Sequence, residues 1–324
     1  MIDRRHFLSR STAFCTAATL PAWAQSPWPA RPIRVVIPYA AGGVTDSVGR
    51  RLIDQMAQAL GQPMVVENKG GAGGTVGMAE VLKATPDGYT LALTAISPLT
   101  LSPHLMKLPY DPAKDVVAVA PMMYSPVYVL ATPAFQGKSW EDLIAQAKAQ
   151  PGTIRFATSG VGSVGHIMLE QIQHLTGAQF VHVPYKGVGQ TVNDAVGGHF
   201  EIMTGNPYGT INGLITQGKL RVLATTGPQR APNQPQVATL AEKGVAAANI
   251  TSLFGFVAPA RTPSDVVQRL SSVVQAQLAT PAIQEALRST DNVGLQMTPS
   301  EFGSLLLQES RANADIIRKA RITL

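Results

Sequence analysis

The chain has 324 residues, 45% of them hydrophobic and 14% charged, which is enough apolar material for one or two domains with large cores. Its formal net charge of +6 is mild, and the basic residues are scattered without interleaved aromatics, which argues against nucleic-acid binding. Cys15 is the only cysteine, so disulfides, thiolate metal sites and cysteine nucleophiles are excluded beyond it.

Residues 1–24 are predicted to be an export signal rather than part of the fold. A pair of arginines at 4–5 precedes a stretch of small and apolar residues, and an A-x-A pattern at 22–24 predicts cleavage before Gln25. The arginine pair resembles a twin-arginine signal, but Asp3 stands where Ser or Thr is usual, so both export routes stay open. The residues before Cys15 form a poor lipidation box. We therefore expect a soluble periplasmic protein without a lipid anchor.

Apolar runs alternate with helical patterns through the rest of the chain. Strands are predicted at 33–37, 64–66, 91–94, 128–131, 155–157, 180–183, 202–203, 221–225 and 255–258. Helices are predicted at 46–60, 74–83, 140–150, 164–175, 189–197, 211–217, 263–278, 281–289 and 299–318. Ser139, Ser264 and Thr298 are predicted N-caps. This alternation indicates an α/β protein with mostly parallel sheets.

Two apolar stretches punctuated by proline, 121–133 and 251–263, are predicted to cross between domains. If both cross, residues 125–252 form one continuous lobe, and residues 25–124 together with 253–324 form the other. The helical C-terminal part is then expected to pack on the first sheet. This is the layout of a two-lobed, hinged binding protein.

The stretch 38–46, Pro-Tyr-Ala-Ala-Gly-Gly-Val-Thr-Asp, joins the first predicted strand to the first predicted helix. Gly42 and Gly43 allow a tight turn whose N–H groups face outward. The helix adds free N–H groups and the positive end of its dipole. Such a turn binds an anion without a charged side chain. A βα turn without a ligand is the alternative, and this stretch alone does not separate the two.

A second glycine-rich turn, at 68–77, is not a nucleotide loop. Its G-x-G is followed by Val76 where the third glycine of a dinucleotide loop belongs, and the chain holds no G-x-x-x-x-G-K-[ST]. A third turn, at 157–166, again follows a strand, and Ser159 and Ser163 add hydroxyl donors beside Gly162. It lacks the G-x-S-x-G of a hydrolase elbow. His166 is either a hydrogen-bonding partner of a ligand or a residue on the helix surface.

Two further turns follow predicted strands. In 182–189, Tyr185 can stack on a ligand or form a hydrogen bond with it. Lys186 either contacts a carboxylate or is simply solvated. In 203–207, Asn206 follows the strand. The histidines are too widely spaced for a metal site, and no acidic residues cluster with them. Few residues suit catalysis and many suit anion binding, so the sequence favours a binding protein over an enzyme.

These segments together resemble the tripartite tricarboxylate transporter substrate-binding proteins, the Bug-type periplasmic receptors. The resemblance covers nearly the whole mature chain and is carried by residues 28–29, 32–36, 38–46, 66–77, 86–90, 108–111, 160–166, 183–187, 218–224 and 255–259. It implies a periplasmic-binding-protein type 2 fold, with two α/β lobes joined by two crossing segments and a ligand cleft between them. It implies no catalytic residues, no metal and no cofactor, and the family expectation is a monomer.

The resemblance also implies where a small carboxylate binds. One carboxylate would lie at Ala41, Gly42 and Gly43, beneath Tyr39. The second lobe would supply Ser159, Gly162, Ser163, His166, Tyr185 and Lys186. Ser97, Gly187 and Asn206 are further candidate contacts from the remaining turns. Closure of the lobes would then signal to the membrane subunits of a secondary transporter.

The chain departs from the family pattern at two places. Residues 203–206 replace a Phe-Asp pair that the family often has, which argues against recognition of an amino acid's ammonium group. Ser102 stands where the family usually has Asn, while Ser97 stays a candidate contact. We therefore expect a non-amino dicarboxylate, tricarboxylate or aromatic acid. Two alternatives are a periplasmic sensor of the same fold, and an exported esterase using Ser163 with His166.

Overall fold

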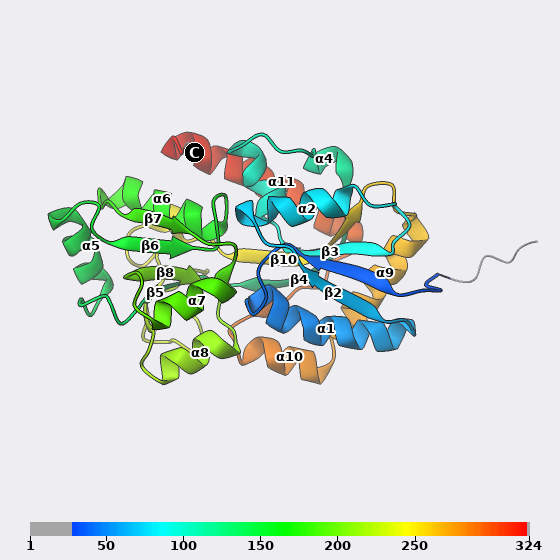
Figure 1. Cartoon of the computed structure of the whole chain (residues 1–324), viewed down its shortest axis with the longest axis horizontal. Coiled ribbons are helices and arrows are strands. Elements are labelled where there is room, and N and C mark those ends of the chain that lie inside the picture. The colour runs from blue at the N-terminus through cyan, green and yellow to red at the C-terminus, as the bar shows by residue number, and fades with distance from the viewer. Residues whose placement is uncertain (1–27, 323–324) are drawn as a thin grey trace, which may run out of the picture.

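The computed structural model describes residues 28–322. The predicted export signal, including Cys15, lies outside the described residues. Two α/β lobes lie side by side, each built on one sheet and covered by helices (Figure 1). The predicted two-lobed fold is confirmed.

The first lobe holds a six-stranded sheet and the second a five-stranded sheet. The first has the order β11-β4-β10-β3-β1-β2, with strands β1 (Ile33–Ile37), β2 (Met64–Asn68), β3 (Thr90–Ala95), β4 (Val116–Ser125), β10 (Ser252–Pro259) and β11 (Val293–Gly294). The second has the order β7-β6-β8-β5-β9, with strands β5 (Tyr128–Ala131), β6 (Arg155–Thr158), β7 (Val181–Pro184), β8 (Ile202–Gly205) and β9 (Arg221–Ala224).

The helices lie mostly where the apolar periodicity predicts them. They are α1 (Val44–Leu60), α2 (Thr75–Leu82), α3 (Ser97–Thr100), α4 (Pro112–Asp115), α5 (Trp140–Ala149), α6 (Val164–Thr176), α7 (Val188–Val196), α8 (Gly209–Thr216), α9 (Ser264–Leu278), α10 (Pro281–Arg288) and α11 (Pro299–Ala320), with 3-10 turns η1 (Ala72–Gly74), η2 (Ser102–His104) and η3 (Ala246–Ala248). Ser139 and Thr298 are N-caps with capping boxes, as predicted. Ser264 is not: it is the first helical residue, and Pro263 precedes it without a side-chain cap. None of the described helices is long and apolar enough to cross a membrane.

The sheets are mixed, so the prediction of mostly parallel sheets is wrong. β1 pairs in parallel with β2 and β3, and β6 pairs in parallel with β7 and β8. The strands that flank the crossings run the other way: β10 is antiparallel to β3 and β4, and β5 is antiparallel to β8 and β9. At each crossing the chain enters the new sheet from the opposite end, so β5 and β10 run antiparallel to the strands that they join.

The strand β4 was not predicted, and its second half, from Pro121, was assigned to the first crossing segment. In the register with β10, Phe254 pairs with Met123 and Gly255 pairs with Pro121, so Met122 is an extra residue at an irregularity. A proline is tolerated at such a bulge, because no ladder hydrogen bond is required from its missing N–H. The chain then crosses to the second sheet through Pro126 and Val127, and it returns between β9 and β10.

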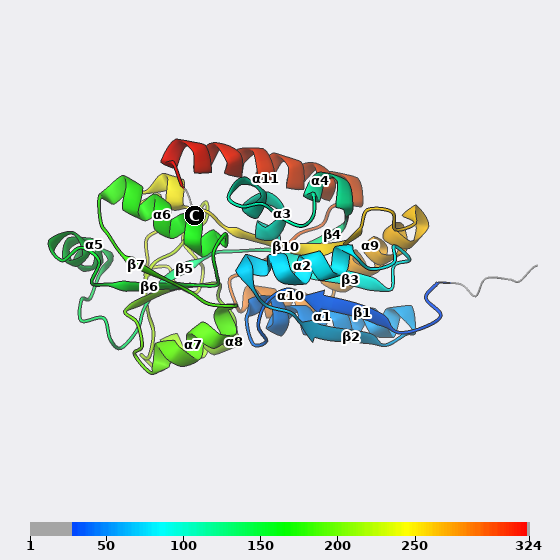
Figure 2. The ribbon, with the colours of Figure 1, turned by 45° about the horizontal axis from the view of Figure 1, so that its top comes forward.

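The C-terminal helix α11 lies along both lobes (Figures 1 and 2). Phe302, near its start, is fully buried in an apolar cluster of the first lobe with Val36 and Met78. Ile317, near its end, belongs to the apolar cluster of the second lobe with Ile167. The helical C-terminal part therefore packs against both lobes and not only on the first sheet. The exact boundaries between the lobes, at residues 124–125 and 252–253, stay a prediction.

Candidate functional site

A pocket of about 50 Å³ lies between the lobes, where the carboxyl ends of parallel strands from both sheets face each other. In α/β proteins this edge is where ligands bind, because the loops that follow the strands converge there. The lining residues are Tyr39, Ala40, Gly43, Val44, Thr45, Asp46, Ala95, Ser97, Val127, Ser159, Ser163, Val164, Gly165, Val188, Thr204, Gly205, Asn206, Ser252 and Phe254.

Three helices begin at this pocket. Helix α1 starts from the first lobe, with Gly43 as its N-cap in an extended conformation (φ −85°). Helices α6 and α7 start from the second lobe, and Ser163 and Val188 at their beginnings line the pocket. Because the first N–H groups of a helix lack internal partners and its dipole is positive there, the pocket presents electropositive backbone from two opposite sides.

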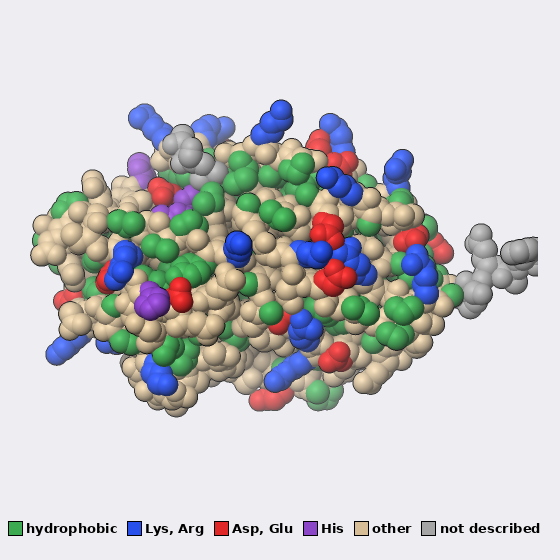
Figure 3. Space-filling model, in the orientation of Figure 1, with side chains coloured by type: hydrophobic (Ala, Val, Ile, Leu, Met, Phe, Trp, Pro, Cys, Tyr) green, Lys and Arg blue, Asp and Glu red, His purple; other side chains and the backbone are tan. Residues whose placement is uncertain are grey.

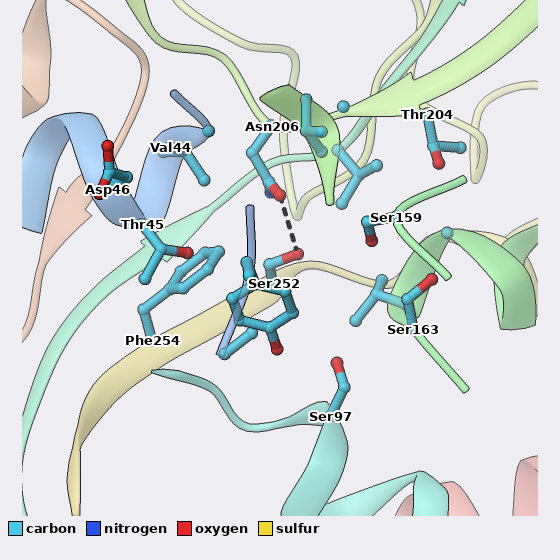
Figure 4. Close-up of a pocket in the computed structure, with 18 of the residues that line it drawn as sticks. Val44, Thr45, Asp46, Ser97, Ser159, Ser163, Thr204, Asn206, Ser252 and Phe254 are labelled. Atoms are coloured by element: carbon cyan, nitrogen blue, oxygen red, sulfur yellow. Dashed lines mark hydrogen bonds between the residues drawn. The ribbon is translucent and has the colours of Figure 1, made fainter. Parts of the chain in front are cut away.

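The polar side chains of the pocket are almost all neutral hydroxyls. Seven of them line it: Tyr39, Thr45, Ser97, Ser159, Ser163, Thr204 and Ser252. None of the described lining residues is Lys, Arg or His. Figure 4 shows the labelled hydroxyls around a common space, with Asp46 set apart at the edge. The Tyr39 hydroxyl is buried close to Thr94 and the Ala95 backbone, and burial raises its pKa.

The turn before α1 is held from behind by a charged network. The Asp46 carboxylate accepts hydrogen bonds from the Gly42 amide, from Arg50 Nε and from Asn68 Nδ2, each at 3.0 Å. Asn68 Nδ2 also donates to the Tyr39 carbonyl at 3.1 Å. Burial would raise the pKa of Asp46, but the donors Arg50, Gly42 and Asn68 outweigh it and hold the pKa below its usual value. Asp46 is therefore committed to the turn and has little capacity left for a ligand's ammonium group.

The turn before α6 is held by a buried, neutral pair of imidazoles. His166 Nδ1 accepts from the Gly162 amide at 3.3 Å, and its ring stacks on His182 with centroids 4.4 Å apart. His182 Nε2 lies 2.7 Å from the Thr158 hydroxyl. Burial lowers the pKa of both imidazoles to about 4, with a further contribution to His166 from the neighbouring His182. Because only 5% of His166 is exposed, its interpretation as a residue of the helix surface is wrong.

Ser163 and His166 do not form a nucleophile–base pair. The Ser163 hydroxyl accepts from the backbone N–H of His166 at 3.3 Å and so caps α6. The imidazole is engaged elsewhere: Nδ1 accepts from Gly162, and Nε2 lies 3.7 Å from a Glu170 oxygen. A catalytic pair requires the base to contact the nucleophilic hydroxyl.

The predicted contact residues divide into two groups. Those that line the pocket are Tyr39, Gly43, Ser97, Ser159, Ser163 and Asn206, and those that do not are Ala41, Gly42, Gly162, His166, Tyr185, Lys186 and Gly187. Several members of the second group are occupied in other ways. The amides of Gly42 and Gly162 are bonded to Asp46 and His166, and the Tyr185 hydroxyl donates to Asp194 at 2.6 Å.

Three hydroxyl residues of the pocket were missed. Thr204 lies in the quoted segment 203–207, but only Asn206 was selected there. Ser252 was assigned to a crossing segment, whereas it begins the fully buried strand β10, and its hydroxyl lies 3.5 Å from Asn206 Oδ1. Thr45 was quoted as part of the first turn and was not selected. Ser252 could have been identified as a pocket residue from the sequence, because it is a polar residue at the start of an apolar strand.

Charge lies on the surface instead. Arg34 bonds to Glu67 at 2.8 Å and also to Glu80, and Lys69 lies 3.3 Å from Glu80. On the face shown in Figure 3, basic and acidic side chains adjoin each other rather than gathering in one basic stripe. Among residues 28–322, no group of three or more His, Cys, Asp or Glu side chains has a metal-binding arrangement.

The fold and the interlobe pocket define a two-lobed solute-binding protein of the periplasmic-binding-protein class. Residues 48–322 match the TctC family, described as "Tripartite tricarboxylate transporter family receptor". The chain is 34% identical over 294 residues to protein BugT of Bordetella pertussis, covering 90% of each chain. The chain belongs to this family, whose members are non-enzymatic substrate-binding receptors.

Solved structures of relatives agree with this assignment. The periplasmic binding protein BugD is 32% identical and superimposes with a TM-score of 0.87, covering 91% of this chain and 99% of that one. MatC of Rhodopseudomonas palustris, solved with malate, is 29% identical with a TM-score of 0.84 (89% and 99% covered). R. palustris Rpa4515, solved with adipate, is 28% identical with a TM-score of 0.86 (91% and 99% covered). Relatives of this chain thus bind dicarboxylates.

Proposed function

We propose that this protein captures a small, non-amino dicarboxylate in the interlobe pocket, in the periplasm, and delivers it as a monomer to the membrane subunits of a tripartite tricarboxylate-type transporter. The observation that carries the proposal is the meeting of helix N-termini from opposite lobes at one pocket lined by neutral hydroxyls. The receptor family and the predicted export signal support the proposed delivery and location.

Two electropositive sides suit a ligand with a negative group at each end. The start of α1 with Thr45 would meet one carboxylate, and the start of α6 with Ser163 would meet the other. Hydrogen bonds to a charged group are the stronger kind, and neutral donors already fixed by the fold need little reorganisation to form them. Binding through neutral donors also avoids burying a lysine or arginine, which would be costly whenever the ligand is absent.

The pocket favours a ligand without an ammonium group. Its only acidic side chain, Asp46, is saturated by the Gly42 amide, Arg50 and Asn68. Relatives of this chain have been solved with malate and with adipate, which supports a dicarboxylate over an aromatic acid.

The proposal is tested by thermal unfolding of the mature protein from Gln25, first unfolded and refolded to remove any ligand carried through purification. The panel is succinate, malate, adipate, citrate, benzoate, aspartate and glucose. A ligand at 100 times its Kd stabilises the fold by about 2.7 kcal/mol. We expect the largest shift with a dicarboxylate. A larger shift with aspartate would refute the non-amino assignment, and a shift with glucose alone would refute carboxylate binding.

A substitution of Tyr39 by Phe sharpens the test. Since the hydroxyl makes no well-formed hydrogen bond to its neighbours Thr94 and Ala95, its removal should change the melting temperature of the ligand-free protein little. If the hydroxyl donates to a carboxylate, the Kd of the best panel ligand rises by about tenfold, measured by calorimetry. An unchanged Kd would remove Tyr39 from the ligand contacts.

A further inference from the structure

The two lobes touch each other through backbone at the rim of the pocket. The Ala40 amide, in the turn before α1, donates to the Lys186 carbonyl, in the turn before α7, at 3.2 Å. Ala40 and Val188 both line the pocket, so this contact closes one of its sides. The segments 40–43 and 186–189 form what we name the α1–α7 seam.

Gly189 lies at the tightest point of this seam. A Cβ built on Gly189 would sit 2.0 Å from the Ala41 carbonyl oxygen and 3.1 Å from the carbonyl carbon. Both neighbours are backbone of the opposite lobe, so no side-chain rotation relieves the overlap. A second contact is similar: a Cβ on Gly73 would lie 2.3 Å from the Val161 carbonyl oxygen, across the lobes.

Nothing in the local structure of helix α7 requires a glycine at position 189. Gly189 is the second residue of α7, and its φ lies outside the positive range that favours glycine. Alanine is the better helix former, so the local structure would be stabilised by a side chain here. Only the approach of the first lobe excludes one. Gly73 differs in this respect, because its φ of +62° makes any substitution strained within its own lobe.

We propose that Gly189 is a closure-determining residue: its missing side chain lets the turn at Ala41 reach α7, so that the lobes shut over the pocket. A side chain at Gly189 blocks the closed arrangement and leaves each lobe intact. Gly189 positions the lobes and does not line the pocket. The inference concerns closure and holds whatever ligand the pocket binds.

Closure can be measured without a ligand by a disulfide across the seam. A Cβ on Gly43 would lie 3.8 Å from the Val188 Cβ, within the range of about 3.5–4.5 Å that disulfides require. The chain after Cys15 has no cysteine, so the double variant Gly43→Cys/Val188→Cys carries a single possible bridge. The rate of its oxidation at low protein concentration, followed on non-reducing gels, reports how often the lobes are closed.

The test adds Gly189→Ala to the cysteine pair, with Gly213→Ala as the matched control. Gly213 lies in helix α8, and a Cβ there would have no neighbour within 4 Å. We expect Gly189→Ala to slow bridge formation at least about tenfold and Gly213→Ala to leave it unchanged, because overpacking raises the free energy of the closed state alone. Both variants should melt at or above the parent temperature when ligand-free and reduced.

Three results would overturn the proposal. Equal oxidation rates for the Gly189→Ala and Gly213→Ala proteins would show that the seam tolerates a side chain. A lower melting temperature for ligand-free Gly189→Ala alone would make Gly189 a requirement of the fold. Absence of the bridge in the parent cysteine pair would show that the two turns do not meet. None of these readouts depends on a carboxylate, so failure of the proposed function is seen separately in the ligand panel.

Discussion

The turns before α1 and α6 face the pocket from opposite lobes. They present similar backbone to the pocket, but different side chains support them on the side away from it. Each follows a parallel strand, β1 or β6, and each ends where a helix begins. Behind the first turn lies the charged network of Asp46, Arg50 and Asn68. Behind the second lie His166 and His182, which are kept neutral by burial.

The comparison shows two ways of fixing backbone amides without placing net charge in the pocket. In the first lobe the negative charge of Asp46 is matched by Arg50, whose Nη2 lies 2.9 Å from it. In the second lobe the imidazoles stay uncharged near pH 7, since both pKa values lie at about 4. A positive imidazolium beside the start of α6 would oppose the helix dipole and could no longer accept from Gly162.

The largest difference between the two lobes should appear in mild acid. Between pH 6.5 and about 4 the unfolded chain binds protons at these two histidines and the folded chain does not, so the free energy of unfolding falls as pH falls. Each imidazole, with its pKa shifted from 6.5 to about 4, contributes about 3 kcal/mol, so we expect a loss of about 6 kcal/mol by pH 4 before the carboxyl groups are counted. Glu170, whose pKa burial raises, binds protons more readily in the folded state and partly offsets this loss. Denaturant unfolding at half-unit pH steps measures the curve.

Above pH 5 the two imidazoles contribute most of the change in stability, while Glu170 and Glu309, whose pKa values burial raises, act in the opposite direction. Carboxyl groups with unfolded pKa values near 4.5 titrate mainly below pH 5. Asp46, whose folded pKa is lowered from 3.8, stabilises the fold above that value and loses its contribution only as pH falls through its folded pKa. A stability curve that stays flat from pH 7 to pH 5 would contradict the neutral imidazole pair.

Asp46→Ala should have the next largest effect, at neutral pH. The substitution leaves the Gly42 amide, Arg50 and Asn68 without their shared acceptor. We expect a loss of about 2–3 kcal/mol, because hydrogen bonds to charged groups are the stronger class and partly buried donors are left unpaired. Asp54→Ala, on the exposed side of the same helix, is the control and should change stability by less than about 0.5 kcal/mol. Equal losses in both variants would mean that the network does not support the turn.

Much of the fold could be predicted because its signals are local. The apolar run of β1, the period of α1 and the capping boxes at Ser139 and Thr298 each depend on a few neighbouring residues. Strand β4 was missed because Pro121 is tolerated only through a bulge against β10, and that pairing joins residues more than 130 apart. Strand directions failed for the same reason, since they depend on how the crossings enter each sheet.

The site was predicted less completely, because lining a pocket is a property of two lobes at once. The hydroxyls of Ser159 and Ser163 were found from the turn that contains them. Lys186 was selected for its side chain, and nothing in the sequence indicated that its carbonyl accepts from Ala40 across the lobes. Likewise, the glycine at 189 looks like a helix-weakening residue until the opposite lobe is in place. No local pattern contains that information.

His166→Leu should have the smallest effect and separates the two roles of this residue. At pH 7 we expect a loss of about 1 kcal/mol or less, because the bond to the Gly162 amide is long, at 3.3 Å, and a buried apolar side chain offsets part of its removal. The acid-induced loss above pH 5 should shrink by about half, since one of the two buried imidazoles is gone. His199→Gln, at a largely exposed histidine, should leave the curve unchanged. If His166→Leu retained the full acid loss, the sensitivity would belong to His182 alone, and the second turn would depend on its contact with Thr158.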